Sequence, residues 1–151
     1  MKKYSVGILL YRFKNGKLEV LLVHPGGPFW AKKDEGAWSI PKGLVEEEEA
    51  ILSAAKRELK EETGIEIDGK FIDLGELKQS SEKIVHAFAL KKDLEVKRVK
   101  SNTFKLEWPR GSGIICEYLE IDKARWFDIE EAKRKILKGQ KEFINRLINS
   151  L

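Results

Sequence analysis

The stretch from Gly43 to Ile65, GLVEEEEAILSAAKRELKEETGI, decides the fold. Its apolar residues recur with the period of an α-helix over residues 47–63, and the helix is expected to end there because glycine at position 64 is a typical C-terminal signal. At about 100° per residue, one arc of this helix is apolar and predicted to face the core. The apolar arc contains Ile51, Leu52, Ala54, Ala55 and Leu59.

Carboxylates interrupt this apolar arc. Glu58 and Glu62 fall inside it, and Glu61 falls at its edge. Burying a lone carboxylate costs several kcal/mol, and like charges three or four residues apart on a helix repel each other. Protonation of the acids, arginine partners or a divalent cation could offset this cost. Arg57 can pair with one acid, Glu49 for example, but it cannot neutralise all of them.

Two interpretations of these acids stay open on the pattern alone. Crowded oxygen ligands are typical of a site for a hard cation such as Mg²⁺ or Mn²⁺. The acids could equally form the charged flank of an exposed helix, with flexible side chains pointing to water. The helical period does not decide between a metal site and a solvated flank.

Length and composition exclude several classes of protein. The chain has 151 residues, of which 42% are hydrophobic and 36% charged, which fits neither a disordered chain nor a membrane protein. The length predicts one domain over residues 1–151. A net charge of +4 is too small to indicate a nucleic-acid binder. The single cysteine, Cys116, excludes an intramolecular disulfide and fits a reducing cytoplasm.

Strand patterns alternate with few helical ones along the chain, which predicts an α/β fold with a mixed sheet. Asp128 is expected to cap a helix, with Glu131 in the capping-box position. We expect strands at 4–13, 18–24, 71–77, 84–90, about 95–108 and 124–127. We expect helices at 47–63, 128–137 and about 140–148.

Residues 43–65 resemble the Nudix box of the MutT-like Nudix hydrolases at every fixed position. The box reads glycine, five residues, glutamate, seven residues, then Arg-Glu-aliphatic-x-Glu-Glu-x-Gly-aliphatic. The resemblance implies an α/β/α sandwich with a mixed central sheet and a loop–helix–loop catalytic module. It also implies hydrolysis of a pyrophosphate bond in a nucleoside diphosphate linked to another group X, with Mg²⁺ or Mn²⁺ as cofactor.

The resemblance also assigns roles to individual box positions. Arg57 is implied to orient the helix by pairing with Glu49. The implied metal ligands in the box are Glu58, Glu61, Glu62 and the backbone carbonyl of Lys42. The positions implied to be structural in the motif are Gly43, Glu49 and Gly64.

A further acid is implied downstream of the box. In MutT-like members it stands six residues before a tryptophan of the last strand region and binds metal or serves as base. Glu120 fills that place relative to Trp126, and Glu117 and Glu107 remain alternatives. The implied catalytic residues are therefore Glu58, Glu61, Glu62, Arg57 and Glu120.

Substrate contacts are expected on the N-terminal side of the box. Lys42 and Gly43 are expected to contact phosphate, and Arg110 is a further candidate. Aromatic faces stack well on nucleobases, although core packing is the alternative for Trp38. His24 is interpreted as a structural histidine. The candidates for stacking are Phe29, Trp30 and Trp38.

The residues before the box bear on the substrate. The sequence WSIPKG at 38–43 resembles the lead-in of the diadenosine tetraphosphate and diphosphoinositol polyphosphate branches. Residues 24–42 resemble a bacterial and archaeal branch of predicted nucleotide pyrophosphohydrolases. The leading expectation is a dinucleoside polyphosphate such as diadenosine tetraphosphate. The lack of any tyrosine between Tyr11 and Tyr118 weakens it, because members of that branch often carry one after the box.

Two other functions stay open. One is a MutT-like nucleoside triphosphate pyrophosphohydrolase, and the other is an RNA 5′-end-directed or non-catalytic nucleotide-binding Nudix protein. The expected partner is a small nucleotide in the cytoplasm, with no membrane bound, and the small net charge disfavours nucleic acid as a partner. A homodimer stays open.

Overall fold

The computed structural model of the chain describes residues 3–45, 50–64, 69–96 and 101–151. Its strands are β1 (Lys3–Lys14), β2 (Lys17–Pro25), β3 (Lys42–Leu44), β4 (Ile72–Ser80), β5 (Lys83–Lys91), β6 (Thr103–Glu107), β7 (Ile115–Leu119) and β8 (Ile121–Asp128). Its helices are α1 (Ile51–Thr63), α2 (Ile129–Lys135), the short 3-10 helix η2 (Lys138–Gln140) and α3 (Lys141–Ser150).

The central sheet is mixed, as the sequence predicts. Its strand order is β4-β5-β1-β2-β8, with β3 paired to β1. β1 runs parallel to β5 and antiparallel to β2 and β3. The β1–β2 hairpin turns at Asn15 and Gly16, both with positive φ, as in the hairpin turns that Asn-Gly favours. The sheet therefore joins local hairpins to one long-range parallel pairing.

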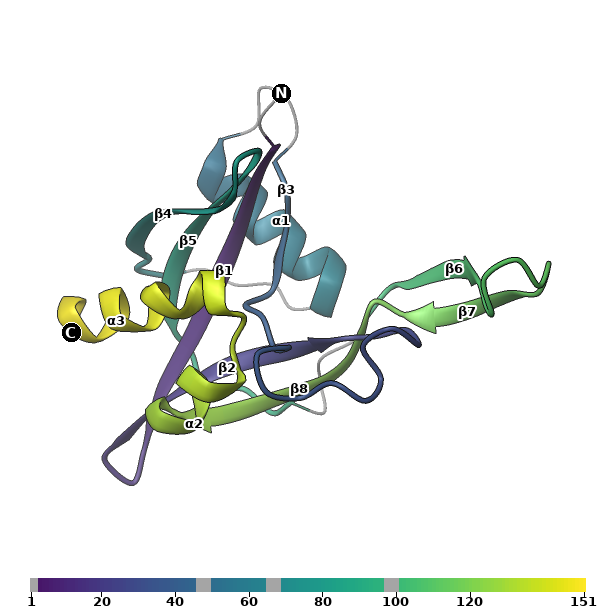
Figure 1. Ribbon diagram of the computed structural model, residues 1–151. Coiled ribbons are helices and arrows are strands. Elements are labelled where there is room, and N and C mark those ends of the chain that lie inside the picture. Colours follow the sequence, from purple (N-terminus) through teal and green to yellow (C-terminus); the bar gives the residue numbers. More distant parts are fainter. Residues whose placement is uncertain (1–2, 46–49, 65–68, 97–100) are drawn as a thin grey trace.

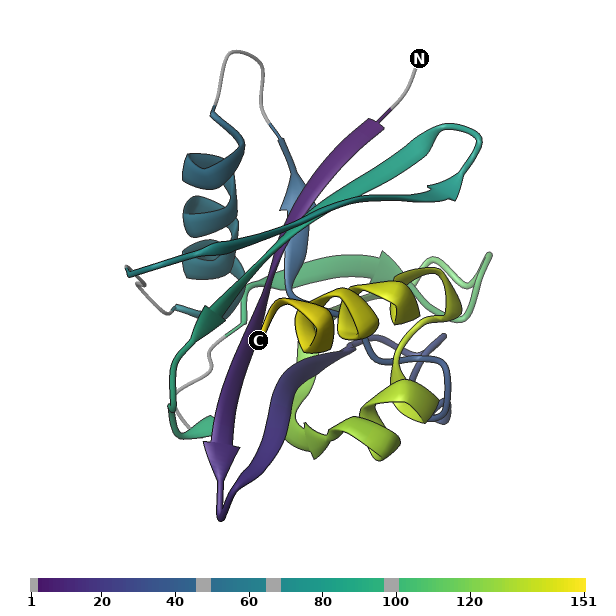
Figure 2. The same ribbon diagram turned by 90° about the vertical axis from the view of Figure 1, so that its left-hand side faces the viewer.

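Helices cover both faces of this sheet, which confirms the expected α/β/α arrangement. Figures 1 and 2 show α1 on one face, with α3 and α2 on the other. The strands alternate side chains between the faces, so two buried clusters form. The α1 side contains Val6, Ile8, Leu10, Leu21, Ala54, Ala55, Leu59, Phe88 and Leu90. The α3 side includes Leu9, Val20, Leu22, Trp38, Phe127, Phe143, Ile144 and Leu147.

Helix α1 has the end that the sequence predicts but not the same start. Gly64 is left-handed at φ 76°, and its N–H donates to the carbonyl of Lys60, so it caps the helix. Ala50 is extended and has no capping side chain, and the described helix begins at Ile51. The expected start at residues 47–49 lies outside the described residues. Asp128 caps α2 as expected by accepting from the N–H of Glu131.

The expected strand at 95–108 is wrong over its first part. The described part of this region forms β6 only from Thr103 to Glu107. β6 pairs with β7 in a separate two-stranded sheet that projects from the body in Figure 1. A loop at residues 108–114 joins the two strands. Among the described residues, no helix is both long enough and apolar enough to cross a membrane.

Candidate functional site

Glu58 lies where α1 meets β3. Its side chain is only 14% exposed, although it is a carboxylate. A Cβ added at Gly43 would stand 1.8 Å from Oε2 of Glu58, which is far inside van der Waals contact. Glycine is therefore needed at position 43 because the carboxylate occupies the space that a side chain would fill. The acid inside the apolar arc packs on the backbone of β3.

Arg57 holds two of the box acids together. Its Nη1 donates to Oε1 of Glu58 at 2.9 Å and to Oε2 of Glu61 at 3.0 Å. Its Nη2 donates to the backbone carbonyl of Leu44 at 3.2 Å, which ties α1 to β3. The expected partner Glu49 lies outside the described residues. Arg57 thus orients the helix through bonds that the structure does describe.

The described acids have the donor chemistry of a hard-cation site. Glu58 and Glu61 present carboxylate oxygens, which Mg²⁺ and Mn²⁺ prefer. The side chain of Glu62 lies outside the described residues. Within the described part of the chain, no three His, Cys, Asp or Glu side chains form a group that could hold a metal. The carboxylates of Glu58 and Glu61 therefore have the chemistry that the expected cation needs, while the prediction that Glu62 is a further ligand stays untested.

A cavity of about 230 Å³ opens beside β3. It lies where the end of β2 and the first residues of β3 and β8 come together. Lys42 and Glu120 both line it, so the structure brings these two predicted residues to one place. Its other lining residues are Val23, Pro25, Trp30, Ala37, Ser39, Ile40, Ile121 and Leu137.

The three alternatives for the downstream acid have different surroundings. Glu120 lines the cavity, and its backbone carbonyl accepts from the N–H of Gly26 at 2.9 Å. Glu117 lies opposite Lys105 in the projecting hairpin. Oε1 of Glu107 accepts from the N–H of the loop residue 111 at 2.7 Å. Of the three acids, Glu120 is the one that lines this cavity together with Lys42.

The aromatic candidates also differ in whether they line the cavity. Trp30 lines the cavity, while Phe29 is 61% exposed and meets the Trp30 ring edge-on at 5.3 Å. Trp38 is only 2% exposed and packs between the rings of His24 and Phe127. The expectation that Trp38 stacks on a nucleobase is therefore wrong, because Trp38 is part of the core. Arg110 sits in the loop at the tip of the β6–β7 hairpin and does not line the cavity.

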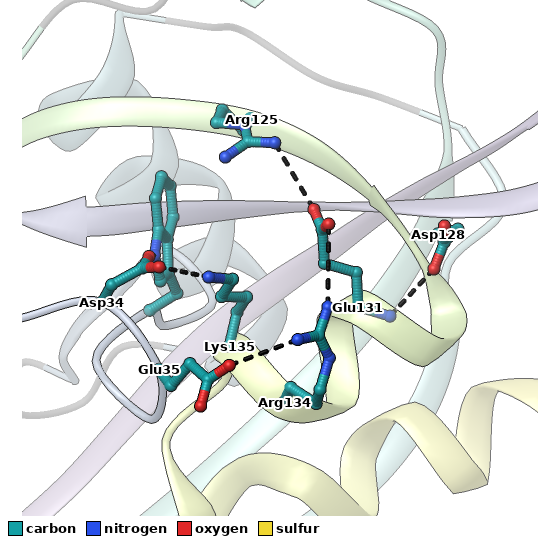
Figure 3. Close-up of polar contacts among 8 residues, drawn as sticks. Asp34, Glu35, Arg125, Asp128, Glu131, Arg134 and Lys135 are labelled. Carbon is teal, nitrogen blue, oxygen red and sulfur yellow. Dashed lines mark hydrogen bonds and ion pairs between the residues drawn. The ribbon is translucent and has the colours of Figure 1, made fainter.

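The loop that carries Trp30 is anchored to α2 (Figure 3). Asp34 accepts from Nε1 of Trp38 at 2.9 Å and pairs with Lys135. Glu35 pairs with Arg134 at 3.2 Å. The bonds from Lys135 and Trp38 lower the pKa of Asp34 below its ordinary value, because both stabilise the carboxylate. The loop is thus held as part of the fold rather than as an unattached lid.

Sequence reasoning missed the apolar lining of the cavity. Ile40 lies just before β3, Ile121 begins β8 and Leu137 follows α2. No local motif joins these segments, since only the tertiary fold brings them together. The bulge between β2 and β8 at Pro25 also has no signal in the hydrophobic pattern.

The comparisons with known proteins agree with the box. The NUDIX domain model matches residues 1–147. Nudix hydrolase 7 of Arabidopsis thaliana is 36% identical over 120 residues, which is 78% of this chain and 36% of the relative. The chain spans about a third of the length of the first curated relatives that it matches.

Solved structures show the same fold. An Ap4A hydrolase of C. elegans superimposes with a TM-score of 0.65 at 21% identity, over 98% of this chain and 96% of that one. A MutT protein of Methanosarcina mazei gives a TM-score of 0.64 at 21% identity, over 99% and 94% of the two chains. With a family model over nearly its whole length and the box geometry described above, the chain belongs to the Nudix hydrolase family.

Proposed function

We propose that the chain, as a single domain over residues 1–151, hydrolyses a pyrophosphate bond in a nucleoside diphosphate linked to another group, with Mg²⁺ or Mn²⁺. One observation carries this proposal. The carboxylate of Glu58 rests against Gly43, and the preceding residue, Lys42, lines the cavity with Glu120 and Trp30. Acids for a cation, a lysine for phosphate and an aromatic wall are therefore contiguous.

Each residue of this arrangement has a role that follows from its chemistry. Glu58, Glu61 and Glu62 would hold the cation, which would neutralise phosphate charge and activate water for attack at phosphorus. Arg57 keeps Glu58 and Glu61 in place. Lys42 binds a phosphate oxygen, and Glu120 holds or moves a proton at the cavity wall. These assignments assume that the phosphates lie over the β3–α1 junction.

The size of the cavity bears on the substrate. A volume of about 230 Å³ is below the range of roughly 300–1,000 Å³ that is usual for pockets of drug-sized ligands. One base or one nucleoside fits such a space better than two do. Trp30 lines the cavity, and bases stack well on aromatic rings. We therefore propose that one nucleoside is bound in the cavity and that group X lies outside it.

A dinucleoside polyphosphate is the leading proposed substrate. It rests on the lead-in WSIPKG, whose lysine is the one that lines the cavity. A nucleoside triphosphate is the second candidate, since a cavity for one nucleoside does not require a second base. The two differ in whether group X carries a base that adds affinity.

The first experiment is a metal-dependent hydrolysis screen of the full chain. Diadenosine polyphosphates, nucleoside triphosphates, ADP-ribose, diphosphoinositol phosphates and 5′-triphosphate RNA are each tested with Mg²⁺ and with Mn²⁺. Preference for diadenosine polyphosphates would support the leading substrate, and preference for triphosphates the second. If the cation binds but none of these compounds is cleaved, the proposal that the chain hydrolyses them is wrong.

Variants then test the residues. Glu58→Gln should lower kcat by about 10²-fold or more while the protein stays folded, because it removes one negative ligand. Glu120→Gln should lower turnover or change the metal dependence. Glu117→Gln is the matched control, since its side chain belongs to the projecting hairpin. Equal kinetics for the Glu117 and Glu120 variants would contradict the role of Glu120.

A further inference from the structure

The buried side chain of His24 contacts two segments of the chain that flank the cavity. His24 stands near the end of β2, and its side chain is 1% exposed. Its Nε2 is 2.6 Å from the backbone carbonyl of Lys33, in the loop that carries Trp30. Its Nδ1 is 2.8 Å from Oδ1 of Asp122, on β8 two residues after Glu120. One buried imidazole thus contacts both the Trp30 loop and the strand that begins directly after Glu120.

A β-bulge brings Asp122 to this histidine. His24 pairs with Lys123 across β2 and β8, but Pro25 pairs with Ile121, so Asp122 is the extra residue. A bulge re-aims the side chain of the extra residue, and bulges are frequent next to functional sites. The irregular pairing therefore provides the carboxylate that orients the ring of His24.

The bond to Lys33 has a defined direction. A carbonyl oxygen only accepts, so Nε2 of His24 carries the proton and donates it. The ring cannot rotate freely, because Asp122 binds its other nitrogen and Trp38 packs against it at 5.2 Å between ring centroids. The contacts of the ring with Asp122 and Trp38 therefore fix the direction in which Nε2 donates.

Holding Lys33 also holds Trp30. The N–H of Lys33 donates to the carbonyl of Trp30 at 2.9 Å, which closes a tight turn between them. The flanking anchors of the loop are the bond from Gly26 to Glu120 and the contacts of Asp34 with Trp38 and Lys135. Among the described contacts, one side-chain hydrogen bond runs from the sheet to the loop backbone between Gly26 and Asp34. It is the bond from His24 to the carbonyl of Lys33.

We propose that His24 is a positioning residue that fixes the Trp30 wall of the cavity relative to the Glu120 wall. The occupant is the nucleobase of the nucleotide, so this inference rests on the proposed function. His24 does not touch substrate, because its ring is buried and both ring nitrogens are engaged. It acts through the carbonyl of Lys33 and the turn to Trp30.

Two substitutions of His24 distinguish its hydrogen bond to Lys33 from its hydrogen bond to Asp122. In His24→Gln the amide nitrogen reaches about as far as Nε2 and still donates to Lys33. In His24→Asn the amide nitrogen reaches only about as far as Nδ1, so the bond to Lys33 is lost. We expect KM for the preferred nucleotide to rise about tenfold in the Asn variant, with kcat changed less than about threefold, and KM to stay within about threefold in the Gln variant.

A double-variant cycle ties the effect to Trp30. In the background of Trp30→Ala, His24→Asn should raise KM no further, because the wall that it positions is gone. His86→Asn is the matched control. His86 also pairs with an aspartate, Asp73, at 2.6 Å, but the two residues lie on β5 and β4, neither of which contributes a lining residue to this cavity, so His86→Asn should leave KM unchanged.

Hydrogen exchange provides a measurement that does not need activity. Exchange in the peptide covering residues 26–36 should be faster in His24→Asn than in wild type or His24→Gln. His24→Phe, which keeps the ring volume against Trp38 and removes both bonds, replaces the Asn variant if that protein does not fold. If wild type hydrolyses none of the substrates, the proposed function fails and the exchange experiment alone decides the inference.

Equal KM in the Asn and Gln variants would overturn the positioning role. So would an effect of His24→Asn that persists in the Trp30→Ala background. Unchanged exchange at residues 26–36 in the Asn or Phe variant would overturn it as well.

Discussion

Gly43 acts through the space that it leaves for Glu58. A Cβ there would lie 1.8 Å from Oε2 and 2.1 Å from Cδ of that side chain, so Gly43→Ala must displace the carboxylate. A shift of about 1 Å at a reacting group can cost about 10²-fold in rate, and we expect a loss of that order. Steady-state kinetics with a thermal melt as the folding control measures it.

The loss in Gly43→Ala should act through Glu58 alone. Combined with Glu58→Gln, the alanine should therefore lower kcat little further, since the carboxylate that it displaces is already absent. Two independent, multiplicative losses would show that glycine at this position serves another purpose.

Asp34 makes stability depend on pH in a defined direction. Bonds from Lys135 and Trp38 lower its pKa in the folded protein, so its contribution to stability is present above the ordinary value near 3.8. That contribution is lost as the pH falls through the lowered folded pKa. Asp34→Asn should therefore lower Tm at pH 6–7, and the difference from wild type should shrink below about pH 4.

Melting curves from about pH 2 to 7 test this dependence. Lys135→Met serves as the partner variant, because it removes the largest cause of the lowered pKa of Asp34. Lys135→Met should lose much of the pH-dependent stability that Asp34 contributes in wild type. A Tm difference for Asp34→Asn that is constant over the whole range would contradict the assignment.

At the scale of elements, α1 depends on the cap at its C-terminus. Gly64 has φ 76°, a conformation that a side chain disfavours, and its N–H bonds to Lys60. Gly64→Ala should therefore lower the free energy of unfolding by about 1 kcal/mol, as measured by urea denaturation. The folded fraction should keep its kcat, since the cap touches no substrate. No change in stability would mean that the helix does not need this cap.

Elements with local signals were predictable, and those fixed by distant contacts were not. The end of α1 follows from one glycine, and the cap of α2 follows from Asp128. The start of α1 has no such signal, because Ala50 carries no capping group, and the expected start at 47–49 lies outside the described residues. The strand expected over 95–108 was wrong at the described residues 95, 96, 101 and 102, because its pattern extends beyond the part that pairs with β7, Thr103–Glu107.

At the scale of the whole molecule, the box was predictable and the cavity was not. Glu58 and Arg57 stand in one motif, so their spacing is visible in the sequence. Trp30 comes from a loop, Lys42 from the start of β3 and Glu120 from the residue between β7 and β8, so only the tertiary fold brings them together. For the same reason the sequence left three acids as alternatives, whereas the structure places one of them on the cavity.

At the scale of the whole molecule, Gln140 in the C-terminal region forms hydrogen bonds to residues that line the cavity. This side chain is fully buried, accepts from the N–H of Ile40 at 3.0 Å and donates to Oγ of Ser39 at 3.0 Å. Both partners line the cavity. Gln140→Leu leaves the N–H of Ile40 buried without its acceptor, which should cost about 1–3 kcal/mol of unfolding free energy.

The matched control for Gln140→Leu is Gln79→Leu. Gln79 donates to the backbone carbonyl of Gly139 at 2.7 Å, but this hydrogen bond is exposed, so water replaces it when it is lost. Its substitution should change stability by less than about 0.5 kcal/mol in urea unfolding. KM should rise only in Gln140→Leu, because Ser39 and Ile40 lead directly into Pro41 and Lys42. Equal destabilisation by the two substitutions would show that the buried amide does not hold the cavity wall.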